Sequence, residues 1–150
     1  MKHILTLLLM TIVTLNGFSQ KIDYSLDKGY IAEGYDVTEY FNGKAVEGKS
    51  SFTTTHDGAK FKFTSQSNLD KFKANPKKYV PQYGGYCAYA LATRKKKVDP
   101  DPEAFKIQDG QLLLFYTSWT TNTKDKWEEE GPKKLKPKAD TNWEKVKYKK

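Results

Sequence analysis

Two pairs of strand-like segments stand out in the pattern of apolar and polar positions. Residues 51–56 are rich in β-branched and aromatic side chains, and residues 59–63 alternate strictly between apolar and polar. Asp57 and Gly58 separate the two segments, and an Asp-Gly pair between such segments is a strong hairpin signal. Residues 104–107 and 112–116 flank Asp109 and Gly110 in the same way. The pattern therefore predicts two β-hairpins.

Helical spacing predicts short helices around these hairpins. Ser65 or Ser67 is suited to cap a helix that carries Leu69 and Phe72 on one face, and the following Asn-Pro pair ends it at Pro76. Further helical patterns cover residues 86–91, 119–129 and 141–146. We expect the lysine-rich stretch from residue 133 onward to be partly loose. Strand pairs mixed with short helices predict an α+β fold, a single small domain.

Near the N-terminal hairpin, Asp36 is suited to begin a helical turn. Glu39 follows three residues later, which is a variant of the capping box. This pattern predicts an extended entry into the domain that changes to a helical turn between residues 29 and 41.

The first nineteen residues have the layout of a secretory signal peptide. A short positive start at Lys2 precedes an apolar run over residues 4–13, and a small-x-small pattern ends at Ser19 before Gln20. The apolar run is shorter than the roughly 20 residues of a membrane span. We therefore predict export, to the periplasm or as a secreted protein, with cleavage between Ser19 and Gln20 and no transmembrane segment in the remainder.

The sequence is basic, with 26 lysine and arginine residues against 18 aspartate and glutamate residues and a formal charge of +8. A basic chain can bind nucleic acid or anionic surfaces. However, Arg94 is the only arginine, and arginine is the residue preferred for bidentate recognition of phosphates and bases. We expect no nucleic-acid partner, and at most a weak association of the lysines with anionic envelope surfaces.

The most unusual segment is 82–90, which joins two glycines to a cysteine and three regularly spaced tyrosines. The glycines permit tight turning or close approach to a ligand. Tyr83, Tyr86 and Tyr89 are spaced by three, so they could line one side of a pocket. If a helix begins here, Cys87 lies in its first turn, where the helix dipole favours a thiolate. The alternative is that Cys87 is a small buried apolar residue and the tyrosines belong to the core.

Few soft metal ligands remain once residues 1–19 are set aside. Cys87 and His56 are then the one cysteine and the one histidine, and no methionine remains. A copper or zinc site built on this pair would need carboxylates such as Asp36 or Glu39, or a second chain, to complete it. The same pair could form a thiol-dependent catalytic dyad, but nothing in the spacing shows that the two residues meet. We therefore predict a protein that is not an enzyme.

Several linked motifs lie along the chain from residue 34 onward. They are the stretch Gly-Tyr-Asp-Val-Thr-Glu-Tyr-Phe at 34–41 and the segments 43–48, 61–65, 72–79, 81–90 and 138–143. Together they resemble the motifs of exported YHS-domain proteins, and the stretch at 34–41 is similar to the opening of that family. Related modules are thought to bind metals through cysteines, and the matching positions here hold Thr64 and Asn68. The resemblance thus implies a YHS-like domain at 34–146, after a lead-in at 20–33 and before a lysine-rich tail at 147–150, whose thiolate ligands are replaced.

Together these observations predict a non-enzymatic envelope protein that binds a metal ion or a small ligand. The tentative metal ligands are Cys87 and His56, with copper or zinc as the metal. Two alternatives stay open: a structural or protein-interaction module that uses aromatic or lysine-rich surface, and a thiol-dependent enzyme that uses Cys87. The predicted ligand-binding residues are Tyr35, Asp36, Tyr83, Gly84, Gly85, Tyr86, Cys87 and Tyr89.

Overall fold

The computed structural model describes residues 20–149, so the predicted signal peptide lies outside the described residues. The strands are β1 (Leu26–Asp27), β2 (Tyr30–Ile31), β3 (Lys49–His56), β4 (Ala59–Phe63), β5 (Asp101–Gln108), β6 (Gln111–Phe115), β7 (Thr117–Ser118) and β8 (Thr121–Asn122). The α-helices are α1 (Gln66–Ala74), α2 (Pro76–Tyr79), α3 (Ala88–Arg94), α4 (Thr123–Glu130) and α5 (Pro132–Val146). Short 3₁₀ helices are η1 (Ala32–Gly34), η2 (Glu39–Asn42) and η3 (Gln82–Gly85). The predicted α+β class is confirmed.

Both predicted hairpins form at their Asp-Gly turns. β3 pairs antiparallel with β4, and β5 pairs antiparallel with β6. The first hairpin belongs to a four-stranded sheet of order β1-β2-β4-β3, in which β2 runs parallel to β4. The first residues of both turns, Asp57 and Asp109, have φ near +50°, a left-handed conformation that aspartate tolerates better than most residues.

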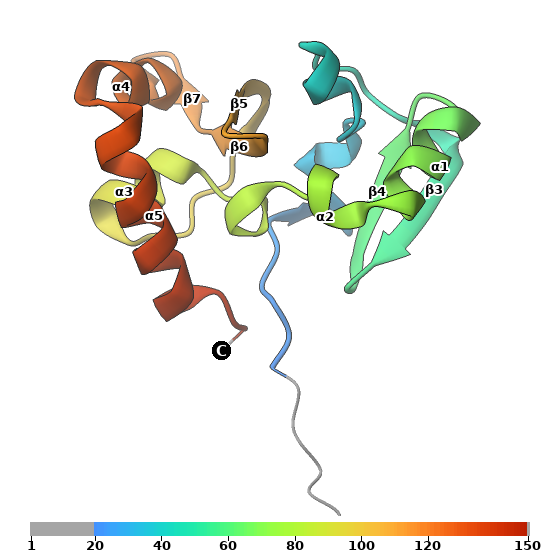
Figure 1. Cartoon of the computed structure of the whole chain (residues 1–150), viewed down its shortest axis with the longest axis horizontal. Coiled ribbons are helices and arrows are strands. Elements are labelled where there is room, and N and C mark those ends of the chain that lie inside the picture. The colour runs from blue at the N-terminus through green and yellow to red at the C-terminus, as the bar shows by residue number, and fades with distance from the viewer. Residues whose placement is uncertain (1–19, 150) are drawn as a thin grey trace, which may run out of the picture.

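Two hydrophobic clusters form the core, and β6 contributes to both. Leu112 and Leu114 belong to the cluster that includes Phe61. Leu113 and Phe115 belong to a second cluster that includes Trp127. Successive side chains of a strand point to opposite faces, so a strand buried on both faces is a continuous apolar run. Figure 1 accordingly shows β5 and β6 between the β3–β4 hairpin with α1 and a group of helices made of α3, α4 and α5.

The helix capped by a serine forms as predicted. The Ser65 side chain accepts a hydrogen bond from the Asn68 backbone N–H at 3.2 Å, and Leu69 and Phe72 are buried. The Asp36 carboxylate instead accepts from the backbone N–H of Thr38, two residues on, at 2.9 Å. That bond orders the turn leading into η2, which begins at Glu39.

The C-terminal predictions are wrong in two respects. The helix expected at 119–129 begins only at Thr123, because Trp119 lies in the turn between β7 and β8. Residues 133–146 are not loose, because they belong to the long helix α5, which buries Leu135 and Ala139 on one face. Pro132 stands in the first turn of this helix, where a missing N–H costs nothing.

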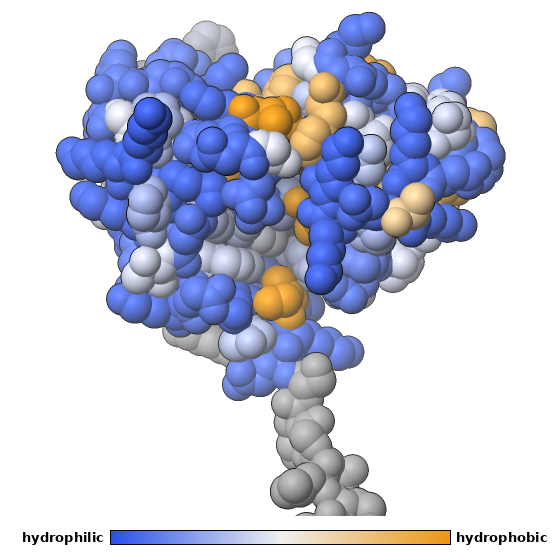
Figure 2. Space-filling view, viewed as in Figure 1, coloured by the Kyte–Doolittle hydropathy of each residue, from blue (hydrophilic) through white to orange (hydrophobic). Residues whose placement is uncertain are grey.

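The described part of the chain, 20–149, contains no helix that is both long enough and apolar enough to cross a membrane. The face in Figure 2 is mostly hydrophilic, with apolar residues in small groups.

Candidate functional site

Asp36 lies at the centre of a closed hydrogen-bond network and is completely buried. Its Oδ1 accepts from the Thr38 backbone N–H at 2.9 Å and from the Thr38 hydroxyl at 2.7 Å. Its Oδ2 accepts from the Thr64 N–H at 2.8 Å, the Thr64 hydroxyl at 3.0 Å and the Asn68 amide at 2.9 Å. Two carboxylate oxygens offer about four lone-pair sites, so five donors saturate them. Asp36 therefore connects η2 to β4 and α1, and it has no acceptor capacity left for a ligand.

Tyr35 lies beside Asp36 in the sequence, but its side chain contacts a different element. The Tyr35 hydroxyl donates to Glu103 on β5 at 3.1 Å. Burial raises the pKa of Tyr35 above its ordinary value, and this hydrogen bond to Glu103 raises it further. The structure thus assigns Tyr35 and Asp36 to contacts between elements of the fold rather than to a shared pocket.

The glycines of the 82–90 segment allow close packing of the chain against itself. Gly84 has φ of +62°, and a Cβ there would lie 2.5 Å from the backbone oxygen of Asp23. The Ser25 N–H donates to the Gly84 carbonyl oxygen at 2.9 Å. The close approach that these glycines were expected to permit is made by the N-terminal segment of the chain itself.

The three tyrosines of the same segment point to three different elements. Tyr83 donates to Asp140 on α5 at 2.8 Å, and Tyr89 donates to Glu130 on α4 at 2.5 Å. Tyr86 donates to the backbone oxygen of Tyr24 at 3.3 Å. Their spacing of three therefore does not make one wall of a pocket, because Tyr83 lies in η3, Tyr86 is the extended residue that follows it, and Tyr89 lies in α3. Burial raises the pKa of Tyr83, and the hydrogen bond to Asp140 raises it further, so the hydroxyl is a neutral donor.

Cys87 has no exposed surface. Its Sγ lies 3.3 Å from the hydroxyl oxygen of Thr123, the first residue of α4. Its backbone N–H donates to the Val98 carbonyl oxygen at 2.9 Å. These contacts match the alternative in which Cys87 is a small buried residue.

His56 ends β3 and packs on the first cluster, away from the contacts made by Cys87. The imidazole lies edge-on to Phe61 and Phe72, and its Nε2 is 3.4 Å from Asp57 Oδ2. The recorded contacts of Cys87 are instead with Thr123 and Val98. Among residues 20–149, no three His, Cys, Asp or Glu side chains gather in a way that could hold a metal ion.

A cleft of about 250 Å³ forms where four parts of the chain meet, and we call it the junction cleft. The N-terminal segment, the β3–β4 turn, the stretch from α2 to η3, and α5 contribute its walls. Its polar lining residues are His56, Asp57, Lys77 and Gln82, and its aromatic ones are Tyr24, Tyr83 and Trp143. Gly84 also lines it, so three of the residues predicted to bind a ligand or metal, His56, Tyr83 and Gly84, meet here.

The other lining residues of the junction cleft were missed as site residues. Trp143 stands some sixty positions after Tyr83 in the sequence, and no local pattern relates the two, yet their rings are 6.4 Å apart. No signal in the sequence relates these lining residues to one another. Which of them converge depends on how α5 packs against η3.

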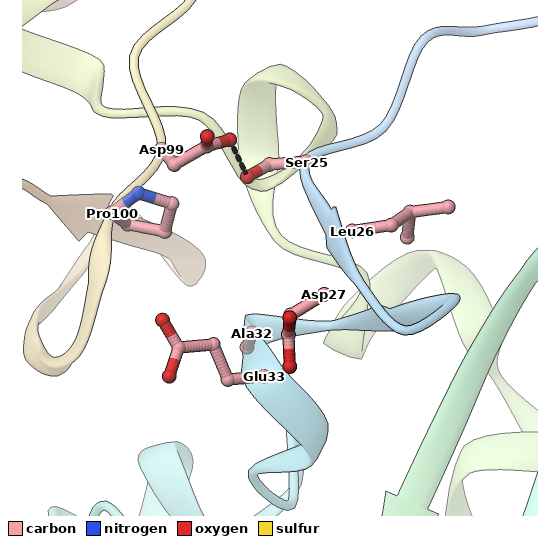
Figure 3. A pocket seen from close by; sticks show the side chains of 7 residues that line it. All are labelled: Ser25, Leu26, Asp27, Ala32, Glu33, Asp99 and Pro100. Atoms are coloured by element: carbon pink, nitrogen blue, oxygen red, sulfur yellow. Dashed lines mark hydrogen bonds between the residues drawn. The ribbon is translucent and has the colours of Figure 1, made fainter.

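A second hollow, of about 180 Å³, is lined by acidic residues (Figure 3). The Ser25 hydroxyl donates to Asp99 at 2.6 Å, and the side chains of Asp27 and Glu33 lie opposite. Burial raises the pKa of Glu33, and the negative charges of Asp27, Asp101 and Asp99 raise it further. This hollow was not anticipated, and its carboxylates do not form a metal-binding group.

The YHS family has a model that matches part of the chain. Its domain model matches residues 37–83, which cover η2, β3, β4, α1 and α2 and reach into η3. The chain carries a YHS domain. No curated protein and no solved structure matches the chain significantly. The YHS match ends at Tyr83, so β5 to α5 and most of the second cluster lie outside the matched range.

The YHS domain is a metal-associated module, and its implied cysteine ligands do not fit the residues found here. Thr64 and Asn68 stand at those positions, and both donate to Asp36 Oδ2. The Asn68 amide also donates to Glu39 Oε1 at 2.7 Å. A network of hydroxyl and amide donors around one saturated carboxylate thus occupies the place where the resemblance implies thiolates.

Proposed function

We propose that this YHS-domain protein is an exported, non-enzymatic binding protein whose small ligand lies in the junction cleft. The observation that carries the proposal is the convergence of His56, Lys77 and Trp143, from separate segments, on one cleft. Ligand sites are commonly concave, with apolar and aromatic walls and a few polar groups that fix orientation. The two hydrophobic clusters hold those walls in place.

The lining residues define the kind of ligand. Lys77 supplies a positive charge, Asp57 a negative one, and Gln82 both a donor and an acceptor. Trp143 and Tyr24 supply flat aromatic surface. The cleft is somewhat smaller than the roughly 300–1,000 Å³ of pockets for drug-sized molecules. These features favour a small polar molecule with a planar part.

A binding role is favoured over a catalytic one by the state of the thiol. A thiol enzyme needs an accessible thiolate next to a general base. Cys87 has no exposed surface, and its sulfur contacts the Thr123 hydroxyl. The same burial favours a small molecule over copper or zinc at Cys87 and His56.

The test is native mass spectrometry of the protein purified from its own host, followed by the same measurement under denaturing conditions. We expect a small-molecule adduct that denaturation removes. Lys77→Gln should lower the occupied fraction, whereas Lys78→Gln should not. Lys78 is the matched control because it follows in the same helix but places its ammonium over the Phe41 and Tyr79 rings.

Two results would contradict the proposal. An adduct retained equally by both lysine variants would place the ligand elsewhere. Stoichiometric uptake of Cu²⁺ or Zn²⁺ that is lost in Cys87→Ser would show that the bound species is a metal.

One observation favours the alternative of a protein-interaction module. Trp119, at the turn between β7 and β8, is fully exposed, and the nearby Tyr116 is 37% exposed. Tryptophan is enriched at protein interfaces, because its ring buries a large contact area, so a fully exposed tryptophan indicates a binding surface. A photo-reactive amino acid at position 119 should crosslink a partner in host cells, whereas one at the exposed position 44 should not.

A further inference from the structure

A third cleft lies where the two ends of the described chain meet. It measures about 520 Å³, and we call it the lysine cleft. Its basic lining residues are Lys95, Lys97, Lys145 and Lys149, and the remaining ones are Asp23, Val146 and Tyr148. None of these residues was assigned to a site by the sequence, and none belongs to the junction cleft.

Among the described residues, positive charge in the lysine cleft exceeds negative charge. Asp23 is the one lining carboxylate within residues 20–149, and Lys97 Nζ already lies 2.8 Å from Asp23 Oδ2. Within residues 20–149, Lys95, Lys145 and Lys149 have no carboxylate within ion-pair distance. The nearby Glu144 pairs with Lys147. Like charges gathered around one concave space repel each other, and a bound anion relieves that repulsion.

The backbone on both sides of the lysine cleft is held in place. Lys149 N–H donates to the Lys21 carbonyl oxygen at 3.1 Å, and Asp23 N–H donates to the Lys147 carbonyl oxygen at 2.7 Å. Tyr148 pairs with Ile22 as an isolated β-bridge. The lysine-rich tail expected at 147–150 is therefore tied to the N-terminal segment over its described residues, so the lysines need little ordering when an anion binds.

The segment after α3 is fixed in the same way. Lys95 caps α3 in a left-handed conformation, and its N–H donates to the Leu91 carbonyl oxygen at 3.1 Å. Lys97 Nζ reaches across the cleft to the Tyr148 carbonyl oxygen at 3.4 Å. Lysines from α5, from the C-terminal end and from the loop after α3 thus face one space.

We infer that the lysine cleft binds a phosphate-type anion. Lysine acts on phosphate as a point charge and needs no fixed fork geometry, which suits a chain whose one arginine lies elsewhere. Val146 and Tyr148 add apolar surface beside the charges. Phosphate in this form occurs both as a free ion and as the headgroup of an anionic lipid, and the experiment distinguishes these sources.

The experiment measures binding of the purified protein to inorganic pyrophosphate by calorimetry, and to phosphatidylglycerol–phosphatidylcholine vesicles by co-sedimentation. The cleft variant carries Lys95→Gln, Lys145→Gln and Lys149→Gln. The control variant carries Lys44→Gln, Lys71→Gln and Lys73→Gln, which are equally exposed and remove the same charge. We expect the cleft variant to bind about tenfold more weakly or worse, and the control to stay within about twofold.

Each outcome decides the inference. Binding of pyrophosphate supports a free phosphate, and binding of vesicles alone supports a lipid headgroup, provided that the cleft variant is the weaker one. Equal weakening of both variants would mean that only overall charge matters, and would overturn the inference. Absence of binding to either probe would overturn it as well. Circular dichroism checks folding, and the single Lys145→Gln substitution repeats the test with the least disturbance.

This inference is independent of the proposed function. Lys77 lines the junction cleft and not the lysine cleft. Lys77→Gln should therefore leave pyrophosphate and vesicle binding unchanged, so either idea can fail alone.

Discussion

Replacing Asp36 by alanine removes the acceptor that joins η2 to β4 and α1. Five hydrogen bonds, with lengths between 2.7 and 3.0 Å, end on this carboxylate. The hydroxyls of Thr38 and Thr64 can rotate toward other acceptors. The Asn68 amide keeps Glu39 Oε1 and Thr64 Oγ1 as acceptors. The backbone N–H groups of both threonines have less freedom, and Thr38 is almost fully buried.

The expected loss of stability follows from these two donors and from the cavity that the carboxylate leaves. A buried donor without a partner costs about 1–3 kcal/mol. Water that enters the space left by Asp36 recovers part of this cost. We therefore expect Asp36→Ala to lower the free energy of unfolding by about 4 kcal/mol. Such a loss is a large fraction of the roughly 5–15 kcal/mol by which small domains are stable.

Urea unfolding followed by circular dichroism measures this loss. With a slope of about 2 kcal/mol per molar urea, the midpoint should fall by about 2 M. Asp36→Asn, which keeps the shape and one acceptor oxygen, should lose about half as much. Asp70→Ala is the control, because this exposed carboxylate accepts one bond, from Gln66 at 2.8 Å, and should change stability by less than about 0.5 kcal/mol. A loss below about 1 kcal/mol for Asp36→Ala at unchanged slope would refute the reasoning.

Three further predictions concern the segment around Gly84. Cys87, with no exposed surface, should react with iodoacetamide at least about a hundredfold more slowly in the native protein than in urea; similar rates would contradict its burial. Burial, together with neighbouring aspartates, raises the pKa of Tyr86 to about 12. Its contribution to stability is therefore fully present below pH 10, the ordinary pKa, and is lost as pH rises toward 12. Alkaline unfolding should show this loss, and Tyr86→Phe should reduce it. Gly84→Ala, whose Cβ would lie 2.5 Å from a backbone oxygen at φ +62°, should lower stability by more than about 2 kcal/mol. Gly43→Ala, which has φ +77° and open space, should cost about 1 kcal/mol; equal thermal shifts would contradict the packing argument.

Much of the local structure could be predicted because local chemistry decides it. The Asp-Gly pairs at 57–58 and 109–110 favour the tight turns of hairpins, and Ser65 satisfies a free N–H at the start of α1. The start of α5 was missed, because a run of lysines and two prolines is typical of a loop. What makes it helical is the packing of Leu135 and Ala139 on the second cluster, and packing with distant residues is not encoded in the local pattern.

The candidate site was less predictable than the fold. Gln82, Tyr83 and Gly84 line the junction cleft, whereas the tyrosines expected to line one side of a pocket point to three different elements. The left-handed conformation of Tyr83 and Gly84 turns the chain at this point, and the contact with the N-terminal segment holds it. Lys77 and Trp143 could not be joined to Tyr83 from the sequence, because their meeting depends on where α5 docks.

By itself, the sequence determined the α+β class, the two hairpins, the serine-capped helix and the YHS motifs, because turn chemistry, capping and apolar periodicity act between near neighbours. Only the tertiary structure decided that Cys87 is buried, that Asp36 is saturated by Thr64 and Asn68, and that two clefts form where the N-terminal segment meets α5. Those outcomes depend on how segments that are distant in the sequence pack against one another, and that packing involves the whole chain.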